Sequence, residues 1–285
     1  MTSYSRRGFL QATGLFAAGA ALSKNAWAAS PEKLKNFGLQ LYTLRTDLPK
    51  DPKGVLKQVA SFGYTQLESF EGGQGMFWGM TPVEFKNYVG GLGMKIISSH
   101  CDINKDFEKK AADAASIGMK YLICPWVGPQ KSIDDFKKIA EQFNAKGEIC
   151  KKNGIRFAYH NHGYSFKELD GQIPQDVMMD NTNPDTVDFE MDMYWVVNGG
   201  ADINAYLKKY GKRFRLCHVK DRTKGSTEAD ASCILGQGDI DYPSILELAK
   251  QSGVQYFIVE QERYDNTTPI ESAKADAAYL KTLSI

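Results

Sequence analysis

Short apolar runs alternate with longer amphipathic stretches along most of this chain. The apolar runs have the length and the branched and aromatic content of buried strands, and they cover 37–44, 65–70, 95–101, 121–126, 156–160, 187–193, 214–219 and 256–260. The stretches between them have helical spacing, and we predict helices at 52–62, 82–92, 106–117, 133–153, 203–210, 242–252 and 269–283. Glycine follows several of these helices as a stop signal, as in Phe62-Gly63 and Asn153-Gly154.

This strict alternation of strand and helix predicts a parallel sheet, because parallel neighbours need a crossover connection between them. Eight strand–helix units within one domain length favour closure over an open sheet. We therefore predict a single (β/α)8 TIM barrel of the α/β class. The segment after His162 is the least regular, so the fifth helix is expected to be short or broken.

All four histidines fall at or just after the ends of predicted strands, and acidic residues end three more of these runs. The histidines are His100, His160, His162 and His218. A barrel gathers the C-terminal ends of its strands on one rim, so these side chains should converge on one pocket. A pocket of imidazoles and carboxylates predicts a divalent-metal site.

Strand parity indicates which of these side chains point into the barrel, because successive residues of a strand face opposite sides. The intervening positions Phe189, Met191, Val219 and Val259 are apolar, as expected for contact with the surrounding helices. The inward pairs predicted by this parity are His160 with His162, Glu190 with Asp192, His218 with Lys220, and Glu260 with Glu262.

The same residues form a series of motifs that resembles the sugar phosphate isomerase/epimerase family, the xylose isomerase-like TIM barrels. The series runs through Tyr159-His160-Asn161-His162, Phe189-Glu190-Met191-Asp192, His218-Val219-Lys220-Asp221, Gly236-Gln237-Gly238-Asp239-Ile240-Asp241 and Val259-Glu260-Gln261-Glu262. The resemblance implies one divalent metal ion, manganese first, with zinc, cobalt or magnesium as alternatives. It implies Asp192, His218 and Glu260 as ligands, and it places His160 where the family commonly has glutamate.

His160 affects the expected mechanism, because in epimerases of the family one metal-bound glutamate removes a proton from the substrate carbon and a second glutamate returns one. With His160 in place of one of them, we expect the catalytic groups among Glu260, Glu190, His162, Glu262 and Glu68. Lys220 could hold the oxygen that becomes negative as the proton leaves. Predicted substrate contacts are His100, Trp126, Trp195, Arg222 and Glu262. An internal ion pair of Asp192 or Glu260 with Lys220 or Arg222 is the structural alternative to a site.

Residues 1–28 read as an export signal. Ser5-Arg6-Arg7-Gly8-Phe9-Leu10 is a twin-arginine signature, and Ala26-Trp27-Ala28 has the small-x-small form of a cleavage site. We expect residues 29–285 to form the barrel domain. We also expect the chain to interact with the twin-arginine export machinery and to be exported, for example to the periplasm. The apolar run is too short to span a bilayer stably, so no membrane insertion is expected after processing.

Charge narrows the classes of partner. Loss of Arg6, Arg7 and Lys24 from 35 basic residues leaves 32 against 34 acidic residues, a net charge of −2. Such a balance gives no reason to expect nucleic acid as a partner. Gly236-Gln237-Gly238 lacks the other residues of a phosphate loop and is expected to form a turn over the pocket rim. A homo-oligomer is left open.

Three functions follow from these observations. The first is an exported, metal-dependent isomerase or epimerase that acts on a sugar or keto-sugar by proton abstraction beside a metal-polarised carbonyl. The second is a lyase or hydrolase-type enzyme that acts on keto-glycosides through the same proton abstraction. The third is a carbohydrate-binding barrel without catalysis, consistent with the missing first glutamate.

Overall fold

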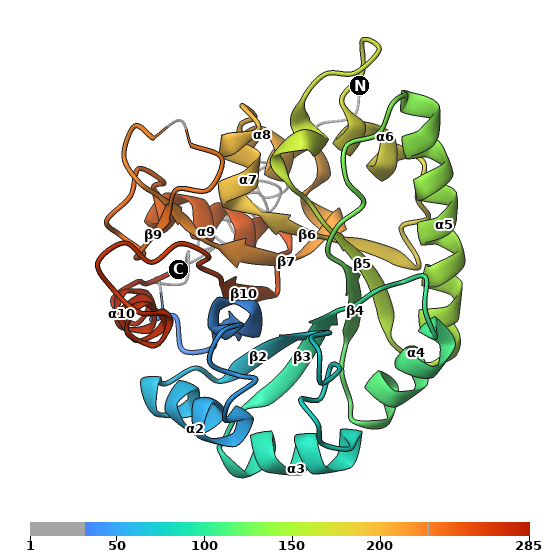
Figure 1. Cartoon of the computed structure of the whole chain (residues 1–285). Coiled ribbons are helices and arrows are strands. Elements are labelled where there is room, and N and C mark those ends of the chain that lie inside the picture. Colours follow the sequence, from blue (N-terminus) through green and yellow to red (C-terminus); the bar gives the residue numbers. More distant parts are fainter. Residues whose placement is uncertain (1–31, 227) are drawn as a thin grey trace, which may run out of the picture. The chain divides into compact units, whose positions relative to one another are not determined.

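The computed structural model describes residues 32–226 and 228–285, so the predicted export signal lies outside the described residues. Residues Lys33–Ile285 form one compact unit, built around a closed barrel of eight parallel strands (Figure 1). The strand order around the barrel is β1-β10-β7-β6-β5-β4-β3-β2. The barrel strands are β1 Gly38–Gln40, β2 Gln66–Phe70, β3 Lys95–His100, β4 Tyr121–Cys124, β5 Arg156–His160, β6 Val187–Asp192, β7 Phe214–Val219 and β10 Tyr256–Val259. The predicted (β/α)8 barrel is confirmed.

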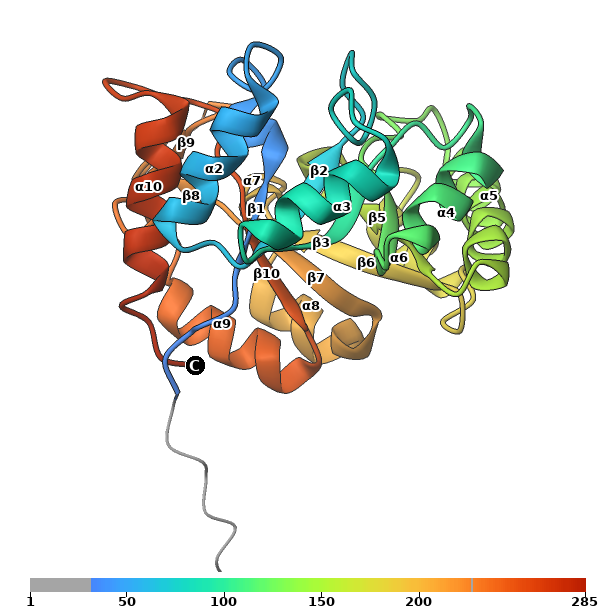
Figure 2. The ribbon, with the colours of Figure 1, turned by 90° about the horizontal axis from the view of Figure 1, so that it is seen from below.

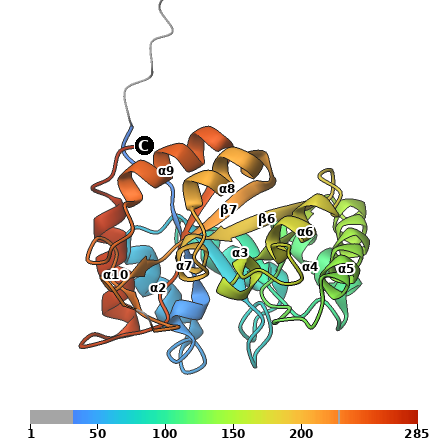
Figure 3. The same ribbon diagram turned by 90° about the horizontal axis from the view of Figure 1, so that it is seen from above.

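Helices lie outside the barrel and cover its strands, as the views from below and above show (Figure 2, Figure 3). They are α2 Pro52–Phe62, α3 Pro82–Gly91, α4 Phe107–Ser116, α5 Ile133–Lys152, α6 Pro174–Asp180, α7 Met193–Asn198, α8 Ile203–Tyr210, α9 Tyr242–Ser252 and α10 Pro269–Leu280. Three 3-10 segments, η1 Leu41–Leu44, η2 Gly163–Phe166 and η3 Gly211–Arg213, and a two-stranded antiparallel pair, β8 Asp221–Arg222 and β9 Ser232–Cys233, complete the described chain. None of the helices in this described part combines the length and apolar character needed to cross a membrane.

Local signals explain why several elements begin and end where the sequence predicts. Helix α2 starts with Pro52 after the Asp51 cap, whose side chain accepts a hydrogen bond from the Gly54 N–H. It ends at Gly63, which has a φ of 93° that a residue with a Cβ rarely adopts. The irregular segment after His162 contains η2 and then the seven-residue α6, as expected of a broken fifth helix.

Most predicted bounds agree with the structure to within three residues, but one strand is clearly shorter than predicted and one helix was not predicted. The first predicted strand, 37–44, stops at Gln40 because the Gln40 side chain accepts the Tyr42 N–H and the chain turns into the 3-10 segment η1. The short helix α7 was not predicted. It begins directly after β6 because the side chain of Asp192 caps it by accepting the Trp195 N–H.

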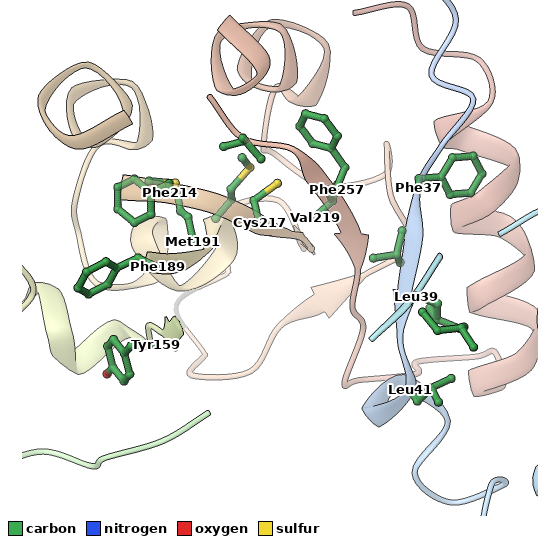
Figure 4. Close-up of a cluster of buried hydrophobic side chains, with 14 of the residues drawn as sticks. Phe37, Leu39, Leu41, Tyr159, Phe189, Met191, Phe214, Cys217, Val219 and Phe257 are labelled. Carbon is green, nitrogen blue, oxygen red and sulfur yellow. The ribbon is translucent and has the colours of Figure 1, made fainter. Parts of the chain in front are cut away.

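The barrel separates two apolar layers, and this separation positions the site. Outward-facing residues such as Phe189, Met191 and Val219 pack between strands and helices (Figure 4). Inside the barrel, a smaller cluster contains Ile97, Tyr121, Ile123, Ala158, Leu216 and Ile258. The next inward residues on three of these strands are polar, namely His160, His218 and Glu260. An apolar plug therefore supports a polar layer at the C-terminal rim.

Candidate active site

Four side chains of the polar layer converge on one point. They come from the ends of β5, β6, β7 and β10, and they are His160, Asp192, His218 and Glu260. Strand register contributes directly to this convergence, because Asp192 pairs with His218 across β6 and β7. All four are buried, and one ligand atom from each lies within 4.8 Å of the others.

The distances suit a shared cation. His218 Nδ1 lies 3.7 Å from Asp192 Oδ2 and 3.4 Å from Glu260 Oε2, and His160 Nε2 lies 3.9 Å from Asp192 Oδ2. Ligand atoms about 2 Å from a tetrahedral ion are separated by about 3.3 Å, so a small contraction would bring these atoms into coordination. Asp192 Oδ2 and His218 Nδ1 are buried and have no hydrogen-bond partner among the described residues. Buried polar atoms are rarely left unpaired, so these two fit metal ligands.

Backbone contacts fix the direction of Asp192. Its Oδ1 accepts the Trp195 N–H at 2.9 Å, which leaves Oδ2 facing the centre. The Asn161 side chain donates to the Asp192 carbonyl and accepts the Asp192 N–H, both at 3.1 Å. Sequence reasoning did not assign this role to Asn161. Its position between two strand-end histidines was the available signal.

Two further carboxylates lie behind the histidines. Glu68 Oε1 is 2.7 Å from His218 Nε2, and Glu190 Oε2 is 3.1 Å from His160 Nδ1 and 2.8 Å from His100 Nε2. Both carboxylates are fully buried. Each imidazole of the centre therefore has one nitrogen directed to Asp192 or Glu260 and the other held by a carboxylate, as in many metal sites.

A role of Glu68 or Glu190 as a base stays a prediction; the structure places both beside the histidines, and neither lines the cavity above the centre. Glu68 is held by donors that were not predicted: Gln40 Nε2 donates to Oε1 at 2.7 Å, and Ser98 Oγ donates to Oε2 at 2.5 Å. Only the tertiary structure brings these two donors to the carboxylate.

The pKa values of the buried carboxyl and imidazole groups in this layer shift in different directions. Burial opposes ionisation of Glu68, but His100 and His218 lower its pKa well below the ordinary value. Burial raises the pKa of Glu190 to about 7, with Glu68 adding to the effect. Burial lowers the pKa of His160, so this imidazole is neutral and suited to bind a metal. Burial opposes a charge on His218, but Glu190 and Glu260 raise its pKa well above the ordinary value, and the same negative charge would attract a metal cation.

A cavity of about 290 Å³ opens above the centre. This volume is at the lower end for small-molecule sites and suits one sugar ring. Of the predicted substrate contacts, His100, Trp126 and Glu262 line it, and Trp126 is 54% exposed. The remaining lining residues are Tyr42, Pro125, His160, His162 and Glu260.

His162 and Glu262 are the cavity residues best placed for proton transfer outside the four converging side chains. His162 packs edge-on against Trp126 with ring centroids 4.5 Å apart, and the ring of Trp195 lies 5.2 Å away. Its Nδ1 is buried without a hydrogen-bond partner in the described chain, and burial lowers its pKa to about 3. Glu262 forms an ion pair with Lys220, and burial raises the pKa of Glu262.

Lys220 is completely buried and does not line the cavity. Its ammonium group lies 3.4 Å from Glu260 Oε2 and 4.9 Å from the ring centroids of both Tyr194 and Trp195. The internal ion pair considered for Glu260 therefore exists, alongside the converging ligands. Lys220 is positioned to orient Glu260 and Glu262.

Two other predicted features lie away from the centre. Arg222 forms an ion pair with Asp239 at 2.9 Å and is not among the residues that line the cavity, so its role as a substrate contact stays a prediction. The N–H groups of Gly236 and Gly238 both donate to Asp221 Oδ2 at 2.9 Å. Both amides therefore already donate hydrogen bonds within a turn, as expected, and are not available to bind a phosphate.

Comparison with known proteins places this geometry among sugar-modifying barrels. The model of the xylose isomerase-like TIM barrel family matches residues 56–283. A crystal structure of a sugar phosphate isomerase/epimerase from Parabacteroides distasonis is 31% identical, with a TM-score of 0.76, over 86% of this chain and 97% of that one. Inosose dehydratase from Clostridium perfringens is 28% identical over 219 residues, which are 70% of this chain and 68% of that protein. A structure of the IolI protein with a bound zinc atom has a TM-score of 0.70 at 16% identity, over 87% of this chain and 96% of that one, and shares the fold.

Proposed function

Because this chain belongs to the xylose isomerase-like TIM barrel family, we propose that it is a divalent-metal-dependent isomerase or epimerase of a sugar or keto-sugar. The observation that carries the proposal is the pair of orphaned atoms, Asp192 Oδ2 and His218 Nδ1, facing His160 and Glu260 beneath a ring-sized cavity. Two imidazoles and two carboxylates suit manganese, and also zinc or cobalt, better than they suit magnesium.

In this proposal, His160, Asp192, His218 and Glu260 hold the ion. A bound divalent cation polarises a substrate carbonyl or hydroxyl, which makes the adjacent C–H bond acidic enough to lose its proton. The residues behind the centre keep the ligands in place. Glu190 and Glu68 fix the ring orientations of His160 and His218, and Asn161 fixes Asp192.

Proton transfer is assigned to His162 and Glu262, two of the cavity residues that are not ligands. His162 follows β5 and Glu262 follows β10, and these strands are separated in the barrel by β6 and β7. A substrate between them would meet one group on each side. Glu262, oriented by Lys220, removes the proton, and for an epimer a proton from water, relayed through His162, reaches the carbon from the opposite side of the ring.

A lyase that eliminates water is the second candidate, favoured by the similarity to inosose dehydratase. It needs the same first step, the removal of a proton beside a carbonyl. The two reactions then differ in where the second proton goes. Delivery to carbon gives an isomer or epimer, and delivery to a departing hydroxyl gives an unsaturated product.

The first test is metal content with proton exchange. Purified protein should bind about one divalent ion per chain when offered manganese, zinc or cobalt, whereas Asp192→Asn should lose most of it. Asp239→Asn, which changes a carboxylate in the remote Arg222 pair, is the matched control and should bind normally. Keto-sugars incubated with the metal-loaded protein in D₂O should gain deuterium beside the carbonyl, with chelation stopping the exchange.

Product analysis of the same reaction separates the candidates. An unsaturated product with loss of water supports the dehydratase, and a deuterated isomer or epimer supports the first proposal. Sugar binding without exchange, unaffected by chelation, would instead identify a carbohydrate-binding barrel and overturn both.

We further propose that the protein is exported by the twin-arginine pathway, on the basis of Arg6, Arg7 and the Ala26-Trp27-Ala28 segment. Fractionation of cells that express the full chain should find the shortened protein outside the cytoplasm. Substitution of both arginines by lysine should retain it inside. If the parent protein and the double lysine variant were distributed in the same way between the cytoplasm and the exported fraction, export by this route would be contradicted.

A further inference from the structure

A second cavity adjoins the one above the metal centre. It has a volume of about 440 Å³ and shares Tyr42, His100 and Pro125 with the first cavity. Its other lining residues follow strands β2 and β3, so it extends along the same rim of the barrel; they are Phe70, Glu71, Cys101, Asp102 and Lys105. The cavity above the ligands therefore has a neighbouring chamber large enough for another ring.

Aromatic side chains line the boundary between the two cavities. Tyr42 lines both cavities and is 37% exposed, although it is a large side chain with apolar faces. Phe70 packs edge-on against Tyr42 at 5.1 Å, and the Arg45 guanidinium lies 4.7 Å from the centroid of the Tyr42 ring. These contacts fix the position of the tyrosine ring, and its exposed part can contact the apolar C–H face of a sugar ring.

The polar groups of the second cavity favour an uncharged ligand. Glu71 and Asp102 are acidic, whereas Lys105 is the one cationic side chain among the described lining residues. Glu71 is held in position, because its Oε2 accepts from Lys110 Nζ at 2.6 Å and from the Asp102 N–H at 2.9 Å. Both contacts use Oε2, which leaves Oε1 to accept from a hydroxyl group. Lys110 balances the charge of Glu71, and Lys105 balances that of Asp102, so the chamber offers no excess of positive charge for a phosphate. Hydroxyl groups can still donate to the carboxylate oxygens.

We infer that the substrate is an uncharged two-ring sugar, with a keto-sugar ring above the metal centre and a second sugar ring in the chamber beside Tyr42 and Phe70. This inference rests on the proposed function and adds its substrate class. A phosphorylated monosaccharide would leave Tyr42 and Phe70 without a contact and would meet no excess of positive charge among the residues that line the second cavity.

Three probes test the inference on the metal-loaded protein: a keto derivative of glucose, the disaccharide of glucose oxidised at the same carbon, and the 6-phosphate of the keto-glucose. Binding is measured by calorimetry. We expect the disaccharide to bind at least about tenfold more tightly than the monosaccharide, because its second ring adds apolar contact with Tyr42 and hydroxyl contacts with the carboxylates of the chamber. The phosphate should bind more weakly than either.

A bulky substitution in the second chamber provides the matched variant. Lys105→Trp should fill part of the chamber and remove the advantage of the disaccharide, while binding of the monosaccharide stays unchanged. Asn104→Trp is the control, because this exposed neighbour lies outside the walls of both cavities. It should leave both affinities unchanged.

Equal affinity for the two neutral probes, insensitive to Lys105→Trp, would overturn the two-ring inference and leave the proposed function intact. Tightest binding of the phosphate would overturn it in the same way. If metal binds but neither neutral sugar binds or exchanges a proton, the proposed function and the inference both fail.

Discussion

The carboxylate of Glu190 lies 3.1 Å from Nδ1 of His160, on the side of the imidazole away from Asp192. A metal ion at the centre would take Nε2 of this ring, so Nδ1 would carry the proton and donate it to Glu190. Glu190 thus supplies negative charge one layer behind the ligand. The Glu190 carboxylate therefore orients the His160 ring so that Nε2 faces the centre, which is a positioning role.

Glu190→Gln should therefore weaken metal binding without removing a ligand. We expect the dissociation constant to rise about 10- to 100-fold, the usual effect of losing such a partner. Titration with manganese or zinc against a competing chelator measures this. Glu247→Gln on the exposed face of α9 is the control and should have no effect. An unchanged affinity in Glu190→Gln would show that His160 does not depend on this carboxylate.

Glu262→Gln should separate proton transfer from metal binding. The side chain lines the cavity but is not one of the four converging residues, so metal content should stay normal. The rate of deuterium exchange should fall about 10²- to 10⁴-fold, the range for loss of a general base. Exchange kinetics in D₂O and metal analysis of the same sample give both readouts. Exchange at the original rate would remove Glu262 from the mechanism.

Metal removal should lower thermal stability, because the ion binds the folded chain. At a free metal concentration 100 times the dissociation constant, the stabilisation is about 2.7 kcal/mol. For a domain of this size that corresponds to an increase in Tm of roughly 5–10 °C. Calorimetry with and without chelator should show the shift in the parent protein and little of it in Asp192→Asn. A shift of the same size in Asp192→Asn would place the stabilising ion elsewhere.

Asp276 should make stability depend on pH. Burial in α10 raises the pKa of this carboxyl to about 8, although Oδ1 accepts the Leu235 N–H at 2.8 Å. Between about pH 4 and pH 8 the folded state keeps a proton that the unfolded state releases. The free energy of unfolding therefore falls as pH rises through this window, by up to about 1.4 kcal/mol per pH unit.

Asp276→Asn removes this titration, so its free energy of unfolding should fall less steeply between pH 5 and pH 8 in denaturant titrations. The exposed Asp134→Asn is the control and should retain the parent slope. Identical slopes in the parent and Asp276→Asn would contradict a protonated carboxyl at this position.

Leu216→Ala tests the apolar plug beneath the polar layer. Leu216 is fully buried inside the barrel and precedes His218 by two residues. The cavity left by truncation should cost about 2–5 kcal/mol of unfolding free energy. Val83→Ala, at a residue that is 58% exposed, should change stability by less than about 0.5 kcal/mol. Chemical denaturation measures both, and similar values for the two would show that the plug is not tightly packed.

Much of this protein was determined by its sequence alone. Period-two and helical apolar patterns, with proline at helix starts and glycine at helix ends, are local signals, so β5, β7, α2, α8 and α9 have their predicted bounds. The rim of converging histidines and acids was also predictable, because parallel strands gather their C-terminal ends whatever the helices between them contain. The four residues that now form the centre were among those predicted.

Only the tertiary structure decided which carboxylate faces the centre and which one holds the histidines from behind. Glu190 and Asp192 share one strand and one parity, yet two residues of strand separate them by about 6–7 Å along the barrel. Register pairs Glu190 with Leu216 and Asp192 with His218, so one carboxylate lies behind the imidazoles and the other faces the centre. Likewise, only the structure pairs Arg222 with Asp239, whose N–H also donates to the Arg222 carbonyl. Parity is encoded locally, but height in the barrel depends on the register between strands distant in sequence.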